Sequence, residues 1–263
     1  MRNHWKFLLY LVVVLWFSVA QAGSYEDFFR SIKEDDEEIV QSLLQRGFDP
    51  NTPSPDGLHG LFMAMREPSP KVASVLIAWP KTNIEARTPQ DESPLMLAAL
   101  KGHMDLVRQL VARDADINKP GWAPLHYAAT GGHVQIMQFL LEHSAFIDAE
   151  SPNGTTPLMM AAMYGSPEAV KLLLDAGADL AMKNQLGMTA LDFARRGGRP
   201  DSVKLIEARL RDPKPAGPLG PEAKAAALRA QGKPLPSDTG SVVEPGAAPA
   251  PVQAQPARRS GSW

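Results

Sequence analysis

The chain has 263 residues, 44% of them hydrophobic, which is enough for one large domain or two small ones. Its formal net charge of -2 excludes the strongly basic surface on which general nucleic-acid binding depends. It contains no cysteine, which excludes disulfides, thiolate zinc sites, cysteine nucleophiles and lipid attachment through cysteine.

Residues 1–22 have the organisation of a secretory signal peptide. A positively charged start precedes an apolar run from Phe7 to Ala20, and small residues follow at Ala20-Gln21-Ala22. The apolar run is shorter than the roughly 20 residues that a membrane span needs. We therefore expect cleavage before Gly23, export to the periplasm or the medium, and no stable membrane span in the mature protein. In the alternative interpretation the segment is retained, and the protein is a membrane-tethered adaptor.

A pattern recurs through the middle of the chain, from about Tyr25 to Leu210. Its clearest mark is a leucine that in three copies follows a proline, and it stands at Leu61, Leu95, Leu125, Leu158 and Leu191. Self-similarity at a period of thirty-odd residues is typical of a repeat architecture, so it is interpreted before any single residue.

Each copy reads as two helices separated by a glycine turn. A proline such as Pro94 opens the first helix, and paired small residues such as Ala98-Ala99 let neighbouring helices approach closely. The turn glycines are Gly102, Gly132 and Gly165. The second helix carries apolar residues at helical spacing, which predict a buried face in three successive copies: Leu106, Val107, Leu110 and Val111, then Ile136, Phe139, Leu140 and Leu141, then Val170, Leu172, Leu173 and Leu174.

The second helices are expected to end in a left-handed residue. Gly47 and Gly177 adopt that conformation readily, whereas Asp114 and Ser144 occupy the equivalent place and should be somewhat strained.

The segments "SPLMLAALKGHMDLVRQLVARDADIN", "APLHYAATGGHVQIMQFLLEHSAFID" and "TPLMMAAMYGSPEAVKLLLDAGADLA" resemble ankyrin repeats. The whole chain is also similar in organisation to exported ankyrin-repeat proteins of bacteria. The resemblance implies an all-α solenoid of helix-turn-helix units joined by projecting, β-hairpin-like loops. We expect a monomeric domain over residues 23–211 with about six units: 25–53, 54–87, 88–119, 120–151, 152–184 and 185–211.

Four copies depart from the pattern. One step is 30 residues rather than 33, so the loop "NKPG" before Trp122 should be short. In the second copy, "HGLFMAMREPSPKVASVLIAWPKTN", prolines replace the Gly-His turn. The acidic run from Glu34 to Glu38 and the charged end of the last copy predict terminal caps with wet outer faces.

From Asp212 to Trp263 the chain carries ten of its 24 prolines and one aromatic residue. This composition predicts a disordered tail, residues 212–263, with a possible short helix over 221–231. The tail is interpreted as a plain extension. The alternatives are a spacer and a second binding segment, "PARRSGSW".

The histidines are interpreted as structural. The resemblance implies that His126 forms a hydrogen bond across the loop between repeats, and His103 and His133 are expected to satisfy backbone groups at turns. His143 is expected to be solvated. A metal site that pairs His126 with His133 is the alternative, but no carboxylate or sulfur recurs with them at ligand-like spacing.

The methionines of the first helices are interpreted as packing residues, although Met163 could also line a binding surface. Binding of haem or copper through the four of them is the alternative: Met96, Met159, Met160 and Met163.

The resemblance implies that a partner is bound by the loop tips and by the exposed side of the first helices. At these positions the side chains of successive repeats would form an apolar stripe flanked by arginines, made of Trp122, Leu100, Met163, Tyr164 and Met188. The predicted partner-binding residues are Leu58, Arg66, Leu100, Lys101, Trp122, Thr130, Met163, Tyr164, Met188, Arg195 and Arg196. In the alternative, Trp122 only packs over the shortened loop.

No catalytic motif is found, because the chain lacks a nucleophile elbow, a phosphate-binding glycine loop and a dinucleotide fingerprint. We therefore expect a non-enzymatic interaction module without a cofactor, which scaffolds or regulates another protein of the envelope. A periplasmic binder of metal or haem through His and Met side chains is the alternative.

Overall fold

The computed structural model describes residues 23–67 and 69–213. The predicted signal peptide, and the tail beyond residue 213 with its predicted short helix, lie outside the described residues. Within the described ranges the chain is helical and has no strand, although Pro53 and His59 form an isolated β-bridge. None of the helices in these ranges combines the length and the apolar character needed to cross a bilayer.

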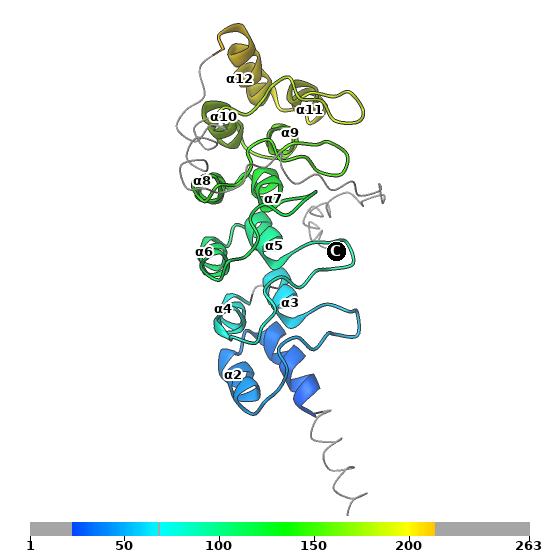
Figure 1. Cartoon of the computed structure of the whole chain (residues 1–263), viewed down its shortest axis with the longest axis vertical. Coiled ribbons are helices and arrows are strands. Elements are labelled where there is room, and N and C mark those ends of the chain that lie inside the picture. The colour runs from blue at the N-terminus through cyan, green and yellow to red at the C-terminus, as the bar shows by residue number, and fades with distance from the viewer. Residues whose placement is uncertain (1–22, 68, 214–263) are drawn as a thin grey trace, which may run out of the picture.

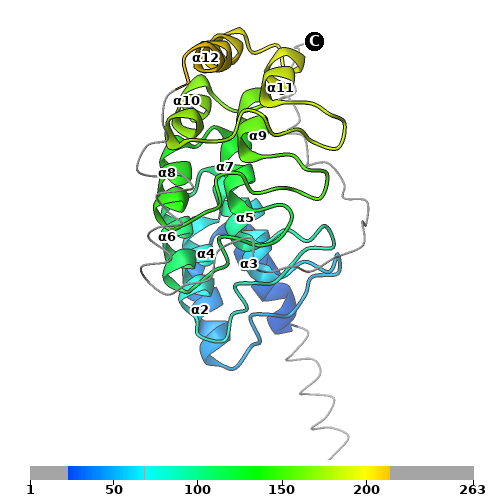
Figure 2. The ribbon, with the colours of Figure 1, turned by 45° about the horizontal axis from the view of Figure 1, so that its top comes forward.

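The helices form two parallel rows, and the loops project from one side of the first row (Figures 1 and 2). The first row consists of the helix over residues 23–34, α3 (Gly60–Arg66), α5 (Pro94–Lys101), α7 (Pro124–Gly131), α9 (Pro157–Met163) and α11 (Ala190–Arg196). The second row consists of α2 (Glu37–Gln45), α4 (Pro70–Ala78), α6 (Met104–Ala112), α8 (Val134–Glu142), α10 (Pro167–Ala176) and α12 (Pro200–Arg211). From α2 to α12, successive helices of each row pack on one another, and from α3 onward each first-row helix packs on its second-row partner, as the repeat pattern predicts.

Reciprocal caps fix the starts of the first-row helices. Ser93 Oγ accepts the Met96 N–H at 3.2 Å, and the Met96 thioether accepts the Ser93 N–H at 3.3 Å. Thr156 and Met159 repeat this arrangement at the start of α9. Proline at the first helical position costs no hydrogen bond there, so the Pro-Leu motif marks where α5, α7 and α9 begin.

The second-row helices bury the expected apolar face with three exceptions, since Val111, Phe139 and Leu172 are only partly buried. Leu106 and Leu173 are buried as predicted. The prediction for Phe139 is wrong, because its ring is only partly buried and lies under the Arg108 guanidinium, 5.1 Å from the ring centroid. Met137 fills the core instead, since positions 136, 137, 140 and 141 face inward together and position 139 falls at the edge of that face.

The left-handed ends of the second-row helices agree with the sequence prediction. Gly47 and Gly177 have φ of +94° and +91°, while Asp114 and Ser144 have φ of +63° and +68°. A side chain at positive φ costs free energy that glycine does not, so Asp114 and Ser144 hold strained conformations.

Helix α4 has neither a terminal glycine nor a capping bond from its own Ser69, and neighbouring repeats cap it at both ends. Asp35 Oδ1, from the preceding repeat, accepts the N–H groups of Lys71 and Val72, both at 3.0 Å. Arg113, from the following repeat, donates to carbonyl oxygens at the other end, including Ile77 O at 2.6 Å. The second copy therefore replaces the missing turn chemistry with bonds between repeats.

Four loops close by the same pair of backbone bonds, seen for example as Ser151 N to Thr155 O at 3.0 Å and Gly154 N to Ser151 O at 2.8 Å. The other closing bonds join Ser54 to Leu58, Thr88 to Glu92 and Asn184 to Met188. Among the described residues, the loop between α6 and α7 lacks this pair, in agreement with its three missing residues.

Candidate functional site

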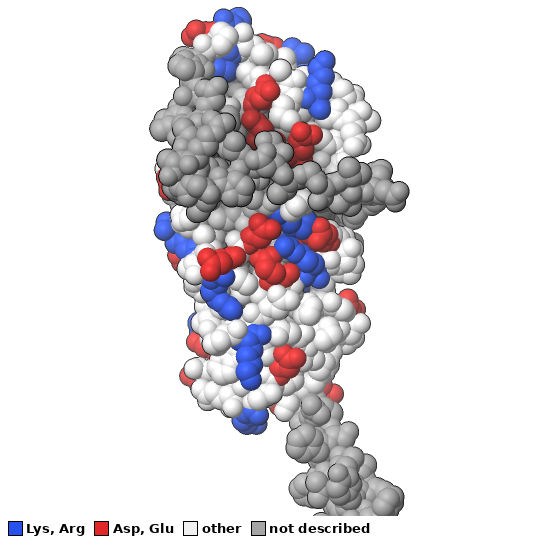
Figure 3. Space-filling model, viewed as in Figure 1, with Lys and Arg blue, Asp and Glu red and all other residues white. Residues whose placement is uncertain are grey.

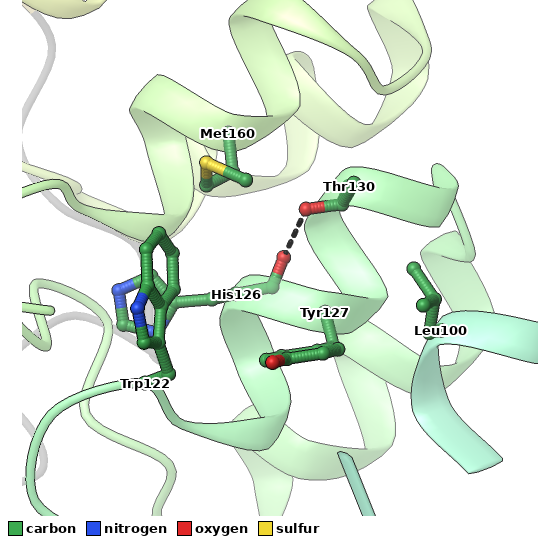
Figure 4. A pocket seen from close by; sticks show the side chains of 6 residues that line it. All are labelled: Leu100, Trp122, His126, Tyr127, Thr130 and Met160. Carbon is green, nitrogen blue, oxygen red and sulfur yellow. Dashed lines mark hydrogen bonds between the residues drawn. The ribbon is translucent and has the colours of Figure 1, made fainter. Parts of the chain in front are cut away.

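Trp122 follows the shortened loop and covers a shallow hollow between α5, α7 and α9 (Figure 4). Its indole ring packs edge-on against the rings of His126 and Tyr127, with centroids 5.3 and 6.5 Å apart. The hollow is lined by Leu100, Trp122, His126, Tyr127, Thr130 and Met160. Trp122 is only partly buried, so it both packs over the short loop and presents an aromatic surface to solvent.

The rim of this hollow is polar. The Tyr127 hydroxyl donates to Glu92 Oε1 at 3.1 Å, and the pKa of Tyr127 is raised by burial and then by the charge of Glu92. Beside it, the buried Lys119 ammonium pairs with Asp91 and donates to the carbonyl of Pro120 at 3.1 Å. These contacts hold the 88–92 loop against the start of α7.

His126 lies fully buried beneath Trp122 and links two loops. Its Nδ1 accepts the Ala123 N–H at 3.1 Å, which leaves the proton on Nε2 to donate to the Thr155 carbonyl oxygen at 2.9 Å. Burial lowers its pKa to about 4, so the imidazole is neutral at pH 7. The expected bond across the loop is therefore present.

The other histidines differ from one another. His133 Nε2 lies 2.9 Å from the carbonyl oxygen of Leu100, as expected for a residue that satisfies a helix end. His103 stands at the same repeated position but has no side-chain bond to a described residue, and burial lowers its pKa. His143 is exposed, as predicted. In residues 23–67 and 69–213 no group of three or more His, Asp or Glu side chains is placed to hold a metal ion.

Leu100, Trp122 and Thr130 are the predicted partner-binding residues that meet in the hollow. Further along the solenoid, Tyr164 at the end of α9 is 43% exposed and Met163 is partly buried beside it.

The remaining predicted residues are spread over the ends of the surface. Met188 is partly buried, and the Arg196 guanidinium lies 3.8 Å from its sulfur. Arg195 instead pairs with Glu207 of α12 at 2.9 Å, which directs its charge towards the second row. Leu58 packs on the core in the second repeat, where Arg66 is exposed, and Lys101 is exposed next to Leu100 in the third.

Tyr127 and Met160 line the hollow but were not predicted. They stand two residues after the motif leucine, where every copy is apolar, so the pattern does not distinguish this position from the core. The tyrosine hydroxyl was the signal that could have distinguished it, because a buried phenol needs a polar partner at an edge. Leu186, 77% exposed at the tip of the last loop, was also missed.

Charges of both signs are interspersed on the face shown in Figure 3, without a large field of one sign. That face therefore has no basic stripe of the kind that nucleic-acid binding uses.

The family model for ankyrin repeats in three copies matches residues 28–120, 61–151, 95–184 and 145–212. The chain belongs to the ankyrin repeat family. Such repeats are general protein–protein interaction modules, and the proteins of this family are typically not enzymes. Their stacked units expose an extended concave surface for binding.

Curated relatives match only part of the chain. The "Ankyrin repeat and SAM domain-containing protein 6" of Mus musculus is 40% identical over 68 residues, which are 24% of this chain and 8% of that protein. The "2-5A-dependent ribonuclease" of Mus musculus is 36% identical over 81 residues, 29% of this chain and 11% of that protein. The human "Notch-regulated ankyrin repeat-containing protein" is 34% identical over 67 residues, 24% of this chain and 59% of that protein. The chain thus covers less than two thirds of each of these relatives.

A solved structure shows the same fold. The crystal structure of an ankyrin repeat domain from Acinetobacter baumannii AYE aligns with a TM-score of 0.60 and 24% sequence identity. The alignment covers 69% of this chain and 96% of that one.

Proposed function

We propose that this ankyrin-repeat protein is an exported, non-enzymatic adaptor that scaffolds or regulates another protein of the cell envelope. The partner would lie on the loops and first-row helices, with its centre at the hollow beneath Trp122. The supporting observation is the group of apolar side chains that remain partly accessible there, Trp122 and Leu100, with Tyr164 exposed further along. Aromatic side chains of this kind dominate the free energy of protein association when a partner buries them.

Export is proposed from the sequence of residues 1–22. Intact-mass measurement of the protein purified from its native envelope tests it. A mass that corresponds to a start at Gly23 supports a cleaved signal, whereas a full-length mass in the membrane fraction supports the tethered adaptor.

Substitution of the surface side chains tests the binding surface. We expect Tyr164→Ala to weaken binding by roughly thirtyfold, equivalent to about 2 kcal/mol, because it removes a large exposed ring from the interface. Trp122→Ala should weaken binding at least as much. Partners are captured from the native envelope with the unmodified chain and identified, and their affinities for each variant are then measured with purified components.

Leu210→Ala is the matched control, because Leu210 is 50% exposed but lies on α12, in the second row. Circular dichroism checks that all three variants fold. Equal affinity of Tyr164→Ala, Trp122→Ala and the control would reject this surface as the binding site.

A further inference from the structure

A column of side chains in the loops links the first five repeats, each to the next. Each member accepts a hydrogen bond from a backbone N–H in the following loop. The bonds are Asn51 Oδ1 to Asn83 N at 2.7 Å, Glu85 Oε1 to Asp116 N at 2.9 Å, Asn118 Oδ1 to Phe146 N at 2.8 Å and Asp148 Oδ1 to Asp179 N at 3.0 Å.

The two asparagines make a second bond that strengthens the link. Asn51 Nδ2 donates to the Lys81 carbonyl oxygen at 2.8 Å, and Asn118 Nδ2 donates to the Ser144 carbonyl oxygen at 2.9 Å. In both cases this carbonyl belongs to the residue two positions before the N–H that the side-chain oxygen binds. The same register assigns the carbonyl of Gly177 to Asp148.

An ionised aspartate cannot donate this second bond, whereas a protonated one carries an O–H that can. We propose that protonation of Asp148 completes the double link to Gly177 and Asp179, which makes the junction between the fourth and fifth repeats a pH-responsive latch. The latch is closed when Asp148 is protonated, and it has a single bond when Asp148 is ionised.

The surroundings of Asp148 shift its protonation from the acidic range towards pH 6. Burial raises its pKa to about 6 and the Asp179 carboxylate also raises it, against the opposing effect of the Asp179 N–H bond. The Asp179 carboxylate is held in position by the Ala181 N–H, 2.7 Å from its Oδ1. No described lysine, arginine or histidine forms an ion pair with Asp148.

Other titratable groups of the adjoining loops do not take over this role. Glu150, in the same loop, is exposed. Lys183, in the next loop, acts on Asp192 instead. His126 binds the same loop through the Thr155 carbonyl, and with a pKa of about 4 it stays neutral between pH 5.0 and 7.5 in the folded chain.

The latch connects to the binding surface through repeat five, which carries Met163 and Tyr164 on α9. Loosening above pH 6 would let α9 and α10 open more often relative to α7 and α8. This inference concerns the fold alone and stands whether or not the proposed partner surface is correct.

Hydrogen exchange of the full chain tests the latch by comparing Asp148→Asn with the unmodified protein at pH 5.0 and 7.5. Asparagine donates at every pH, as Asn51 and Asn118 do. With a pKa of about 6 in the folded chain and 3.8 in the open state, opening of the unmodified junction rises about tenfold over this interval. The measured quantity is the ratio of two protection factors of the Asp179 amide, that in Asp148→Asn divided by that in the unmodified protein. This ratio should therefore grow about tenfold from pH 5.0 to 7.5.

The intrinsic exchange rate of the Asp179 amide and the effect of His126 on stability are the same in both proteins, so they cancel in this ratio at each pH. Glu150→Gln is the matched control, and its ratio should not change with pH. A pH-independent ratio for Asp148→Asn would overturn the proposal. A carboxyl NMR titration of the unmodified chain needs no variant, and an apparent pKa below about 4.5 for Asp148 would overturn it as well.

Discussion

At the scale of single residues, His126 joins two loops only because its ring is neutral. The ring has an acceptor nitrogen for the Ala123 N–H and a donor nitrogen for the Thr155 carbonyl oxygen. A protonated ring has two donors, so protonation would break the bond to Ala123 inside a fully buried site. The folded state therefore requires the neutral imidazole, and acidic pH destabilises the fold.

The pH dependence of stability follows from this requirement. Between the ordinary pKa of 6.5 and the folded value of about 4, the unfolded chain binds more protons than the folded one, so stability falls as the pH falls. From pH 7.5 to 5.0 His126 should cost about 2 kcal/mol of unfolding free energy. In urea titrations the variant His126→Gln should lose that part of the pH dependence, whereas His143→Gln, which alters an exposed ring, should keep it.

At the scale of elements, arginines from one repeat cap helices of the repeat before it. Arg113 binds the end of α4, Arg209 binds the Leu174 carbonyl at the end of α10, and Arg199 donates to Met163 O at 3.2 Å and Tyr164 O at 3.0 Å at the end of α9. A guanidinium offers several donors in one plane, which suits the carbonyl oxygens that a helix leaves unpaired.

Removal of one such cap should destabilise the domain measurably. We expect Arg113→Ala to lower the unfolding free energy by about 2 kcal/mol, the range for hydrogen bonds from a charged group. Arg113→Lys should recover only part of this, because an ammonium cannot span several carbonyls. The measurement is chemical denaturation, with Arg66→Ala as the control, because Arg66 is an exposed arginine that pairs with its neighbour Glu67. A full recovery by lysine would contradict the role of guanidinium geometry.

At the scale of the whole molecule, the sequence predicted the stacking of the repeats but not the bonds between them. The leucine spacing, the opening prolines and the short step before Trp122 are local in sequence, and each corresponds to an observed element. The cap of α4 by Asp35 joins residues 36 and 37 positions apart, which no periodic pattern encodes.

The candidate site was predictable in the same partial way. The positions of Leu100 and Trp122 hold different residue types in different copies, which is why the sequence predicted them as binding residues. Tyr127 and Met160 obey the core pattern, although they line the edge of the hollow. Periodicity predicts which face of a helix is buried, but it does not predict where the neighbouring helices stop covering that face.

The error at Phe139 gives a test of how the core is arranged. Leu140→Ala should cost about 2–5 kcal/mol, because it leaves a cavity among fully buried side chains. Phe139→Ala should cost roughly 1 kcal/mol, since the ring is only partly buried and packs at the edge of the core, beside Arg108 and His143. Thermal and urea unfolding compare the two variants. A larger loss at Phe139 than at Leu140 would show that the assignment of faces is incorrect.

The row of loop-to-loop bonds also bears on how the molecule responds to mechanical load. Each repeat touches only its neighbours, so a pull along the long axis passes through the junctions in series, and the weakest junction yields first. Among the four junctions that these bonds bridge, the two with asparagine have two bonds each and those with Glu85 and Asp148 have one, so tearing among these four would start at a carboxylate junction.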